Sequence, residues 1–149
     1  MHGAVCVYTL IVMDDDVHRS VDLSDTRRCY CLAARREARE LTRLYEDKLR
    51  PHGLRATQFS ILAALWIKGA TPLTELADVL GLERTTLTRS AGVMERNGWV
   101  EDASADDARA RPLQLTEAGR AKVEAAYPAW KEVQDMLDRE RRTPADARP

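Results

Sequence analysis

The sequence predicts a single, mainly α-helical domain that carries one small β-hairpin. The chain has 149 residues, a length that suits one compact domain. Apolar residues recur at helical spacing over most of the region 27–138, and strand-like alternation replaces that spacing only at about 99–115. We therefore expect one folded domain over 27–138, an N-terminal extension over 1–26, and a charged, disordered tail over 139–149.

The first two predicted helices are separated by strong stop signals. Arg27 to Leu49 carries apolar residues at intervals of three and four, which is typical of an amphipathic helix. Pro51 and Gly53 end this helix. The second helix, from Ala56 to Lys68, is apolar on nearly every side, so we expect it at the centre of the core. Gly69 ends it.

Shorter elements follow the second helix. Pro112 lies in a predicted strand and is tolerated there only at a sheet edge, so we expect this strand to be an edge strand. Thr116 has the side chain of a helix N-cap, and Pro128 predicts a kink in the last helix. The expected elements are an extended segment at Thr71 and Pro72, helices over Leu73 to Leu80 and Glu83 to Asn97, strands over 99–103 and 111–115, and a helix from Thr116 to Leu137.

The segment from Thr74 to Ala91 has the pattern of a helix-turn-helix. Ala77 precedes Gly81 by four residues, and leucines surround both. Such a motif needs a small residue where two helices cross and a glycine in the tight turn. The spacing alone is also compatible with an ordinary helical hairpin.

The helix after this turn begins with side chains that suit DNA. A recognition helix inserts its N-terminal end into the major groove, where Thr contacts phosphates or thymine methyl groups and Arg reaches guanine edges. Three threonines are poor helix formers that packing does not require, which favours DNA contact over a merely solvated face. The predicted wing adds Arg109 and Arg111, which would reach a neighbouring minor groove. The candidate DNA-binding residues on the helix are Arg84, Thr85, Thr86, Thr88 and Arg89.

Taken in order, these pieces resemble the MarR family of bacterial transcriptional regulators over roughly residues 28–137. The resemblance rests on three stretches, LRATQFSILAALW, LTELADVLGLERTTLTR and MERNGWVEDASADDARARPLQLTEAGR. It implies a winged helix-turn-helix flanked by N- and C-terminal dimerisation helices. It also implies a homodimeric repressor that binds a palindromic operator in double-stranded DNA. By the same resemblance, Arg109 is the wing arginine and Asp107 orients it.

Several features depart from the family pattern, among them Ala108 where similar proteins often carry a second wing arginine, and the net charge of the DNA-reading segment is low. Arg55 replaces the usual capping threonine before the second helix, and Gly92 lies inside the recognition helix. The net charge of −1 averages an acidic region 1–26, with five Asp and one Arg, and a remainder that carries +3. Residues 83–111 hold five basic and six acidic side chains. We therefore expect the affinity for DNA to depend on a few well-placed arginines and on dimerisation, which doubles the number of their contacts.

Two mechanisms of release from DNA are open. Cys29 and Cys31 lie at the start of the predicted first helix beside arginines, which favours the thiolate form. The stretch CLAARREARELTRLY resembles the organic-hydroperoxide-sensing branch of the family, which implies Cys31 as the reactive cysteine and Tyr45 as a residue that bonds it. The alternative is a small aromatic effector in a cleft between the first, second and last helices. The candidate pocket residues are Tyr45, His52, Trp66 and Trp130, each of which is also explained as core.

Functions of other classes have less support. Asp106, Asp107 and the near-neutral charge keep open a protein-interaction module that does not bind DNA. The sequence has no glycine-rich phosphate loop and no nucleophile motif, so a thiol peroxidase built on Cys31 is the only enzyme it suggests. We predict no enzymatic activity, no metal site and no cofactor. The apolar run over 4–13 is too short to cross a membrane, and three cysteines suit a reducing cytoplasm.

Overall fold

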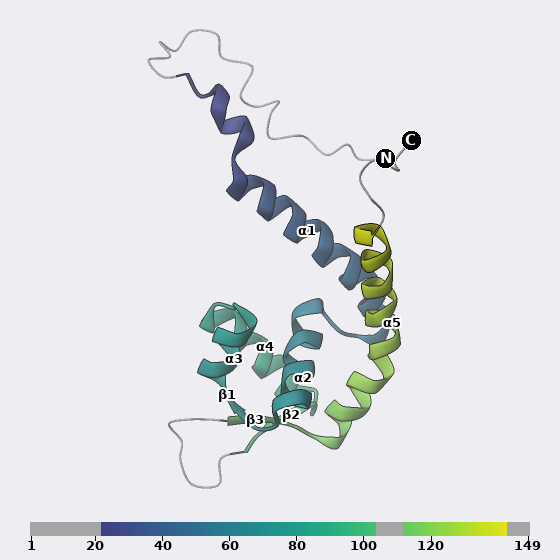
Figure 1. Cartoon of the computed structure of the whole chain (residues 1–149). Coiled ribbons are helices and arrows are strands. Elements are labelled where there is room, and N and C mark those ends of the chain that lie inside the picture. Colours follow the sequence, from purple (N-terminus) through teal and green to yellow (C-terminus); the bar gives the residue numbers. More distant parts are fainter. Residues whose placement is uncertain (1–21, 104–111, 143–149) are drawn as a thin grey trace. The chain divides into compact units, whose positions relative to one another are not determined.

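The computed structural model describes residues 22–103 and 112–142 (Figure 1). The chain divides into two units, Met1–Glu37 and Ala38–Pro149, and the division falls inside the first long helix. The elements, in chain order, are a 3₁₀ turn at Ser24–Arg28, α1 at Tyr30–Leu49, a 3₁₀ turn at Arg50–His52, α2 at Ala56–Lys68, β1 at Thr71–Pro72, α3 at Leu73–Leu80, α4 at Arg84–Arg96, β2 at Val100–Asp102, β3 at Pro112–Leu115 and α5 at Glu117–Arg142.

In the first unit, helix α1 begins at Tyr30 and not at Arg27 as the sequence predicts. The reason is the backbone of Cys29, which is extended with φ −64° and ψ 110° and so separates the 3₁₀ turn from the helix. Within the 3₁₀ turn, the hydroxyl of Thr26 donates a hydrogen bond of 2.7 Å to the carbonyl of Leu23. Every described side chain of this unit is exposed.

In the second unit, α2 lies at the centre of the core, as expected. The carboxylate of Glu46, on α1, accepts a hydrogen bond from the backbone N–H of Ala56 at 3.0 Å and one from the guanidinium of Arg55 at 3.1 Å. Glu46 therefore caps the helix where Arg55 has no acceptor to offer. The side chains of α2 that are buried are Phe59, Ile61, Leu62 and Leu65.

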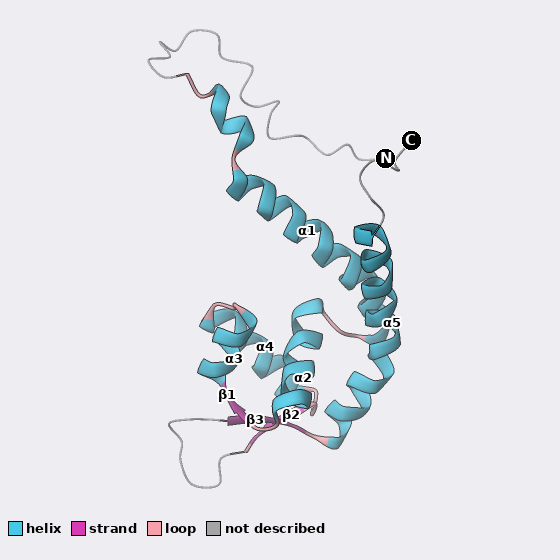
Figure 2. Cartoon of the chain, in the orientation of Figure 1, coloured by secondary structure: helices cyan, strands magenta, loops and turns pink. Residues whose placement is uncertain are grey.

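The sheet has three antiparallel strands in the order β1-β3-β2 (Figure 2). The expectation that Pro112 lies in an edge strand is wrong, because β3 is the central strand. Pro112 is tolerated there because it is the first residue of the strand and stands opposite Pro72. Its carbonyl still accepts a hydrogen bond of 2.7 Å from the N–H of Ala103.

The last helix, α5, begins with the cap that the sequence predicts. The hydroxyl of Thr116 accepts a hydrogen bond of 3.0 Å from the N–H of Gly119 and donates one of 2.6 Å to the carbonyl of Gly98. The helix continues across Pro128 and ends at Arg142, so the first four residues of the expected tail are helical. The mainly helical fold class with a small sheet is confirmed, and β1 adds a third strand to the predicted hairpin.

Candidate nucleic-acid interface and effector groove

Helices α3 and α4 form the helix-turn-helix that the sequence predicts. Gly81 ends α3 in the left-handed conformation, with φ 60° and ψ 33°, which glycine adopts at little cost. The N–H of Leu82 then bonds to the carbonyl of Ala77 at 2.9 Å and closes the turn. Ala77 is 8% exposed, in accord with the need for a small residue where the helices cross.

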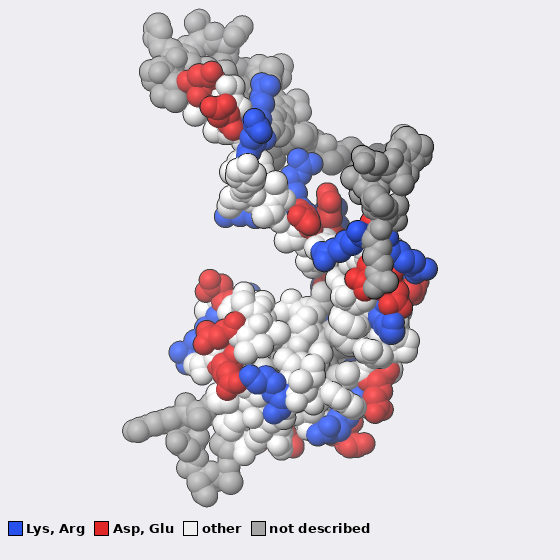
Figure 3. Space-filling model, in the orientation of Figure 1, with Lys and Arg blue, Asp and Glu red and all other residues white. Residues whose placement is uncertain are grey.

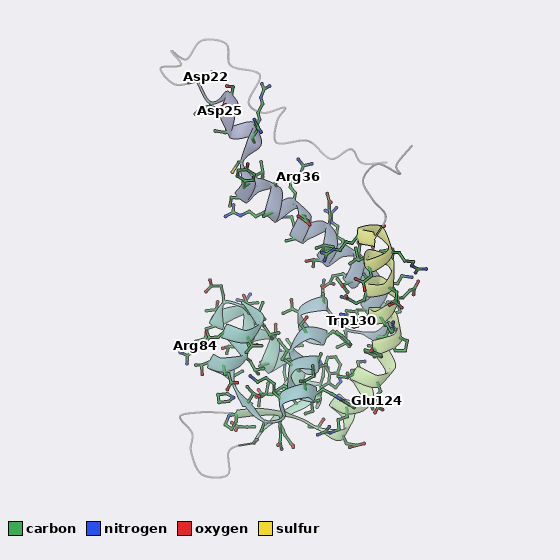
Figure 4. The ribbon with its side chains drawn as sticks, in the orientation of Figure 1. Asp22, Asp25, Arg36, Arg84, Glu124 and Trp130 are labelled. Atoms are coloured by element: carbon green, nitrogen blue, oxygen red, sulfur yellow. The ribbon has the colours of Figure 1, made fainter. Side chains whose placement is uncertain are left out.

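One face of α4 is held in the core and the other is left open. The buried residues of this helix are Leu87, Ala91 and Met94. Arg84, at its first position, projects outward from this part of the molecule (Figure 4). All the DNA-binding residues predicted on this helix are exposed, namely Arg84, Thr85, Thr86, Thr88 and Arg89.

The N-terminal end of α4 offers uncapped hydrogen-bond donors. Glu83 occupies the N-cap position, but no side chain caps the helix there. The first N–H groups of a helix have no partner within the helix, and they favour an anion such as phosphate. The uncapped N–H groups and the exposed side chains at the start of α4 therefore both face solvent.

The threonine hydroxyls at this end are not equivalent. The hydroxyl of Thr88 donates a hydrogen bond of 2.8 Å to the carbonyl of Arg84. Within residues 22–103 and 112–142, the hydroxyls of Thr85 and Thr86 form no hydrogen bond. These two hydroxyls thus keep both donor and acceptor capacity for a ligand, whereas that of Thr88 has already used its proton.

The predicted wing residues Asp107, Arg109 and Arg111 lie outside the described residues. The strands that lead into and out of this segment are described, and they are paired in register. Glu101 lies opposite Gln114, and its carboxylate accepts a hydrogen bond of 2.8 Å from the side-chain amide of that residue.

Charge is mixed over the visible face that carries α3 and α4. Figure 3 shows acidic and basic side chains side by side there, without a continuous basic area. This distribution agrees with the low charge expected from the sequence for residues 83–111. Any attraction for a polyanion depends on individual arginines rather than on a broad positive field.

The candidate redox residues are two cysteines in the first unit and Tyr45 in the second. Cys29 and Cys31 are free thiols, and both are exposed. The hydroxyl of Tyr45, in the second unit, accepts a hydrogen bond from the side-chain amide of Gln134. Burial is the main cause that raises the pKa of the Tyr45 phenol, and the Asp138 carboxylate adds to the effect while Arg141 opposes it.

An apolar groove of about 550 Å³ lies between α2 and α5. Trp66 and Trp130 line it, as predicted, whereas Tyr45 and His52 do not. Tyr45 instead stacks on Trp130 with a centroid distance of 6.5 Å, and His52 lies in the 3₁₀ turn before α2. The full set of lining residues is Phe59, Ala63, Trp66, Ile67, Val123, Glu124, Tyr127 and Trp130.

Sequence reasoning missed most of this lining, although part of it carries a signal. Glu124, Tyr127 and Trp130 follow one another at intervals of three residues, which places them on one face of α5. Trp130 is the centre of the groove's aromatic cluster, since its ring lies 5.7 Å from that of Phe59 and 5.8 Å from that of Tyr127. The pairing of α5 with α2 is what turns this face into a groove wall.

The described part of the chain has neither a membrane-spanning helix nor a metal-binding cluster. None of its helices is long and apolar enough to cross a membrane. Nor do any three of its His, Cys, Asp and Glu side chains come together in a way that would hold a metal ion.

Comparison with known sequences gives one family. The model of the MarR family matches residues 54–110. The uncharacterized HTH-type transcriptional regulator YwoH of Bacillus subtilis is 32% identical over 87 residues, which are 58% of this chain and 64% of the relative. The transcriptional repressor MprA of Escherichia coli is 35% identical over 83 residues, 54% of this chain and 47% of the relative. The chain thus spans between about half and two thirds of the length of these relatives.

Solved structures agree with this family. The transcriptional regulator MosR of M. tuberculosis superposes with a TM-score of 0.70 at 38% identity, over 77% of this chain and 84% of that one. A structure of MosR in complex with DNA gives a TM-score of 0.67 at 44% identity, over 73% and 80% of the two chains. All of these relatives are named as regulators or repressors of transcription.

Proposed function

Since the chain belongs to the MarR family of transcriptional regulators, we propose that it is a sequence-specific DNA-binding protein that represses transcription as a homodimer. The observation that carries the proposal is the open N-terminal end of α4, where uncapped N–H groups, two unengaged threonine hydroxyls and two exposed arginines lie together. Support comes from MosR, which has been crystallised with DNA, and from MprA, which is named a repressor.

In this proposal α4 enters the major groove of a palindromic operator. The uncapped N–H groups and the hydroxyls of Thr85 and Thr86 bind phosphates, and Arg84 and Arg89 reach base edges or phosphates. Arg109 and Arg111 contact the neighbouring minor groove, with Asp107 orienting Arg109. The protein acts in the cytoplasm, where the bacterial chromosome lies.

Exposed apolar side chains support the proposed homodimer. Tyr30 is 87% exposed and Leu32 is 43% exposed, both on α1 in the first unit. On the same helix in the second unit, Leu44 is 38% exposed. Apolar residues left uncovered along an amphipathic helix favour burial against a second copy.

Fluorescence polarisation with the promoter of the protein's own gene tests DNA binding. We expect Arg89→Ala to weaken binding about tenfold, as for the loss of a base or phosphate contact. Arg96→Ala, at the opposite end of α4, is the matched control and should change the affinity by less than about twofold. Each phosphate contact that is lost should also reduce the salt slope by about one. Absence of DNA binding by the wild type would favour a protein-interaction module instead, and equal affinities for both variants and the wild type would show that Arg89 does not contact DNA.

We propose that a small aromatic effector in the α2/α5 groove releases the protein from DNA. The groove has the volume and the apolar lining of a ligand site. A thermal-shift screen with aromatic compounds of either charge, phenolic acids and aromatic cations among them, tests this mechanism. Stabilisation of the wild type that Trp66→Leu abolishes is the expected result, and the absence of any stabilising compound would count against the groove.

Oxidation of Cys31 is the second release mechanism, with Cys29 as a further candidate. The exposure of both thiols supports it, because an oxidant can reach them. Organic hydroperoxide should release wild-type protein from DNA and leave the Cys31→Ser variant bound. If the variant is released at the same peroxide concentration, oxidation of Cys31 is not the signal.

A further inference from the structure

We propose that the groove between α2 and α5 selects a hydrophobic organic cation, held by the ring faces of Trp66, Tyr127 and Trp130 and by the carboxylate of Glu124. This inference rests on the proposed function of the groove as an effector site and names the chemical class of its ligand. Glu124 and Trp130 both come from α5 (Figure 4).

The lining of the groove is the first observation behind this choice. Apart from Glu124, its lining side chains carry no charge at neutral pH. Four of the eight are aromatic, and an aromatic ring face attracts a cation through its quadrupole. A ligand with an apolar body and a positive charge therefore matches both the walls and the one charge of the site.

The state of the Glu124 carboxylate is the second observation. Within the described part of the chain, the carboxylate of Glu124 forms no ion pair and no hydrogen bond. It stands one turn before Tyr127 and two turns before Trp130, at intervals of three residues along α5. A cation that stacks on those rings would lie within reach of the carboxylate, whereas an anion there would be repelled.

A cationic side chain of the protein itself already lies over one aromatic ring of the groove wall. The guanidinium carbon of Arg120 lies 5.6 Å from the centroid of the Trp66 ring. This contact shows that the ring of Trp66 accepts a positive charge on its face. Arg120 is not one of the lining residues, so its guanidinium lies over the wall of the groove and not inside it.

The other cations near this part of the molecule are engaged elsewhere. The ammonium of Lys122 lies over the ring of Trp99, 4.8 Å from its centroid. Lys68, at the end of α2, forms an ion pair with Glu75. Glu124 therefore remains the one charged side chain among the described residues that line the groove.

Access to the groove is open along its outer wall. Ile67 is 81% exposed, Tyr127 48% and Trp66 41%. Such a surface also suits a second copy of the chain, and a test of the proposal has to separate that occupant from a small cation.

Two probes of similar shape and opposite charge test the inference. Isothermal titration calorimetry of the full chain with tetraphenylphosphonium should show one site per chain, and tetraphenylborate should bind at least about tenfold more weakly. Glu124→Gln should weaken tetraphenylphosphonium binding about fivefold. Glu140→Gln removes the same charge from an exposed position of α5 outside the groove and should leave the affinity unchanged.

Three outcomes would overturn the inference. The first is borate binding as tight as phosphonium binding, and the second is an equal effect of Glu124→Gln and Glu140→Gln. The third is the absence of phosphonium binding. An Ile67→Asp variant that then sediments as a monomer, where the wild type is a dimer, would show that a second copy covers the groove. DNA binding by the same preparation separates the two proposals. A protein that binds phosphonium but not DNA refutes only the proposed function. A protein that binds DNA but not phosphonium refutes only this inference.

Discussion

The carbonyl oxygen of Trp99 fills the space that a side chain at position 119 would need. A Cβ built on Gly119 would lie 1.9 Å from this oxygen, far inside van der Waals contact. The N–H of Thr116 donates a hydrogen bond of 3.1 Å to the same carbonyl. The end of the helix-turn-helix and the start of α5 are thus joined backbone to backbone, at a distance that only glycine allows.

Replacing Gly119 should therefore damage the fold. We expect Gly119→Ala to lower the free energy of unfolding by about 3 kcal/mol, because the backbone of Trp99 must move to admit a methyl group. Gly92→Ala is the matched control, since a Cβ there meets only the flexible end of Arg96 at 3.5 Å. That variant should gain about 0.5–1 kcal/mol from better helix propensity. Urea denaturation measures both, and a Gly119→Ala variant as stable as the wild type would contradict the close approach.

The cap at Thr116 should be worth a measurable part of the stability. Thr116→Val keeps the shape of the side chain but loses its hydrogen bonds to Gly119 and Gly98, which should cost about 1–2 kcal/mol. Thr116→Ser retains the hydroxyl and should lose less than about 0.5 kcal/mol. The two urea midpoints give the comparison, and a Thr116→Val variant as stable as the wild type would show that the hydroxyl does not contribute.

The two unengaged hydroxyls of α4 predict a difference among its threonines. Thr85→Val and Thr86→Val should each weaken operator binding about fivefold, as for the loss of one hydrogen bond to DNA. Thr88→Val should have a smaller effect, because its hydroxyl already donates to the carbonyl of Arg84. Fluorescence polarisation at one fixed salt concentration measures the three variants. A larger loss for Thr88→Val than for the other two would contradict the proposed orientation of the helix.

The phenol of Tyr45 predicts a loss of stability in alkaline solution. Burial raises its pKa above the ordinary value of 10.0, so the folded protein holds this proton more tightly than the unfolded chain does. As the pH rises past 10, the unfolded chain loses the proton first and unfolding is favoured. The decline should be shallower in Tyr45→Phe.

Urea midpoints of both proteins at pH 8 and at pH 10.5–11 measure this effect, and the values at pH 8 provide the baseline. The pKa of Lys131 is also raised, by its hydrogen bond to Asp135, and this adds a decline in the same direction. Because Lys131 is present in both proteins, its contribution cancels in the comparison. Parallel declines would show that Tyr45 does not contribute.

Much of the fold and of the DNA-reading face follows from local sequence. The helix-turn-helix was predicted from a small residue and a glycine four positions apart, and the structure places Gly81 in the left-handed turn that this spacing requires. Likewise, Thr116 caps α5 through a hydrogen bond to a residue three positions away. Contacts of this range depend on helix geometry alone, so periodicity, caps and stop residues are enough to predict them.

By itself, then, the sequence determined where most helices lie, which face of α4 is polar and where α5 begins. Only the tertiary structure decided which distant segments meet. It paired β1 with β3, so that Pro112 opens a central strand, and it brought Trp66 of α2 into one groove with Glu124 and Trp130 of α5. These contacts depend on the packing of whole elements around α2, and a residue's neighbours along the chain carry little information about them.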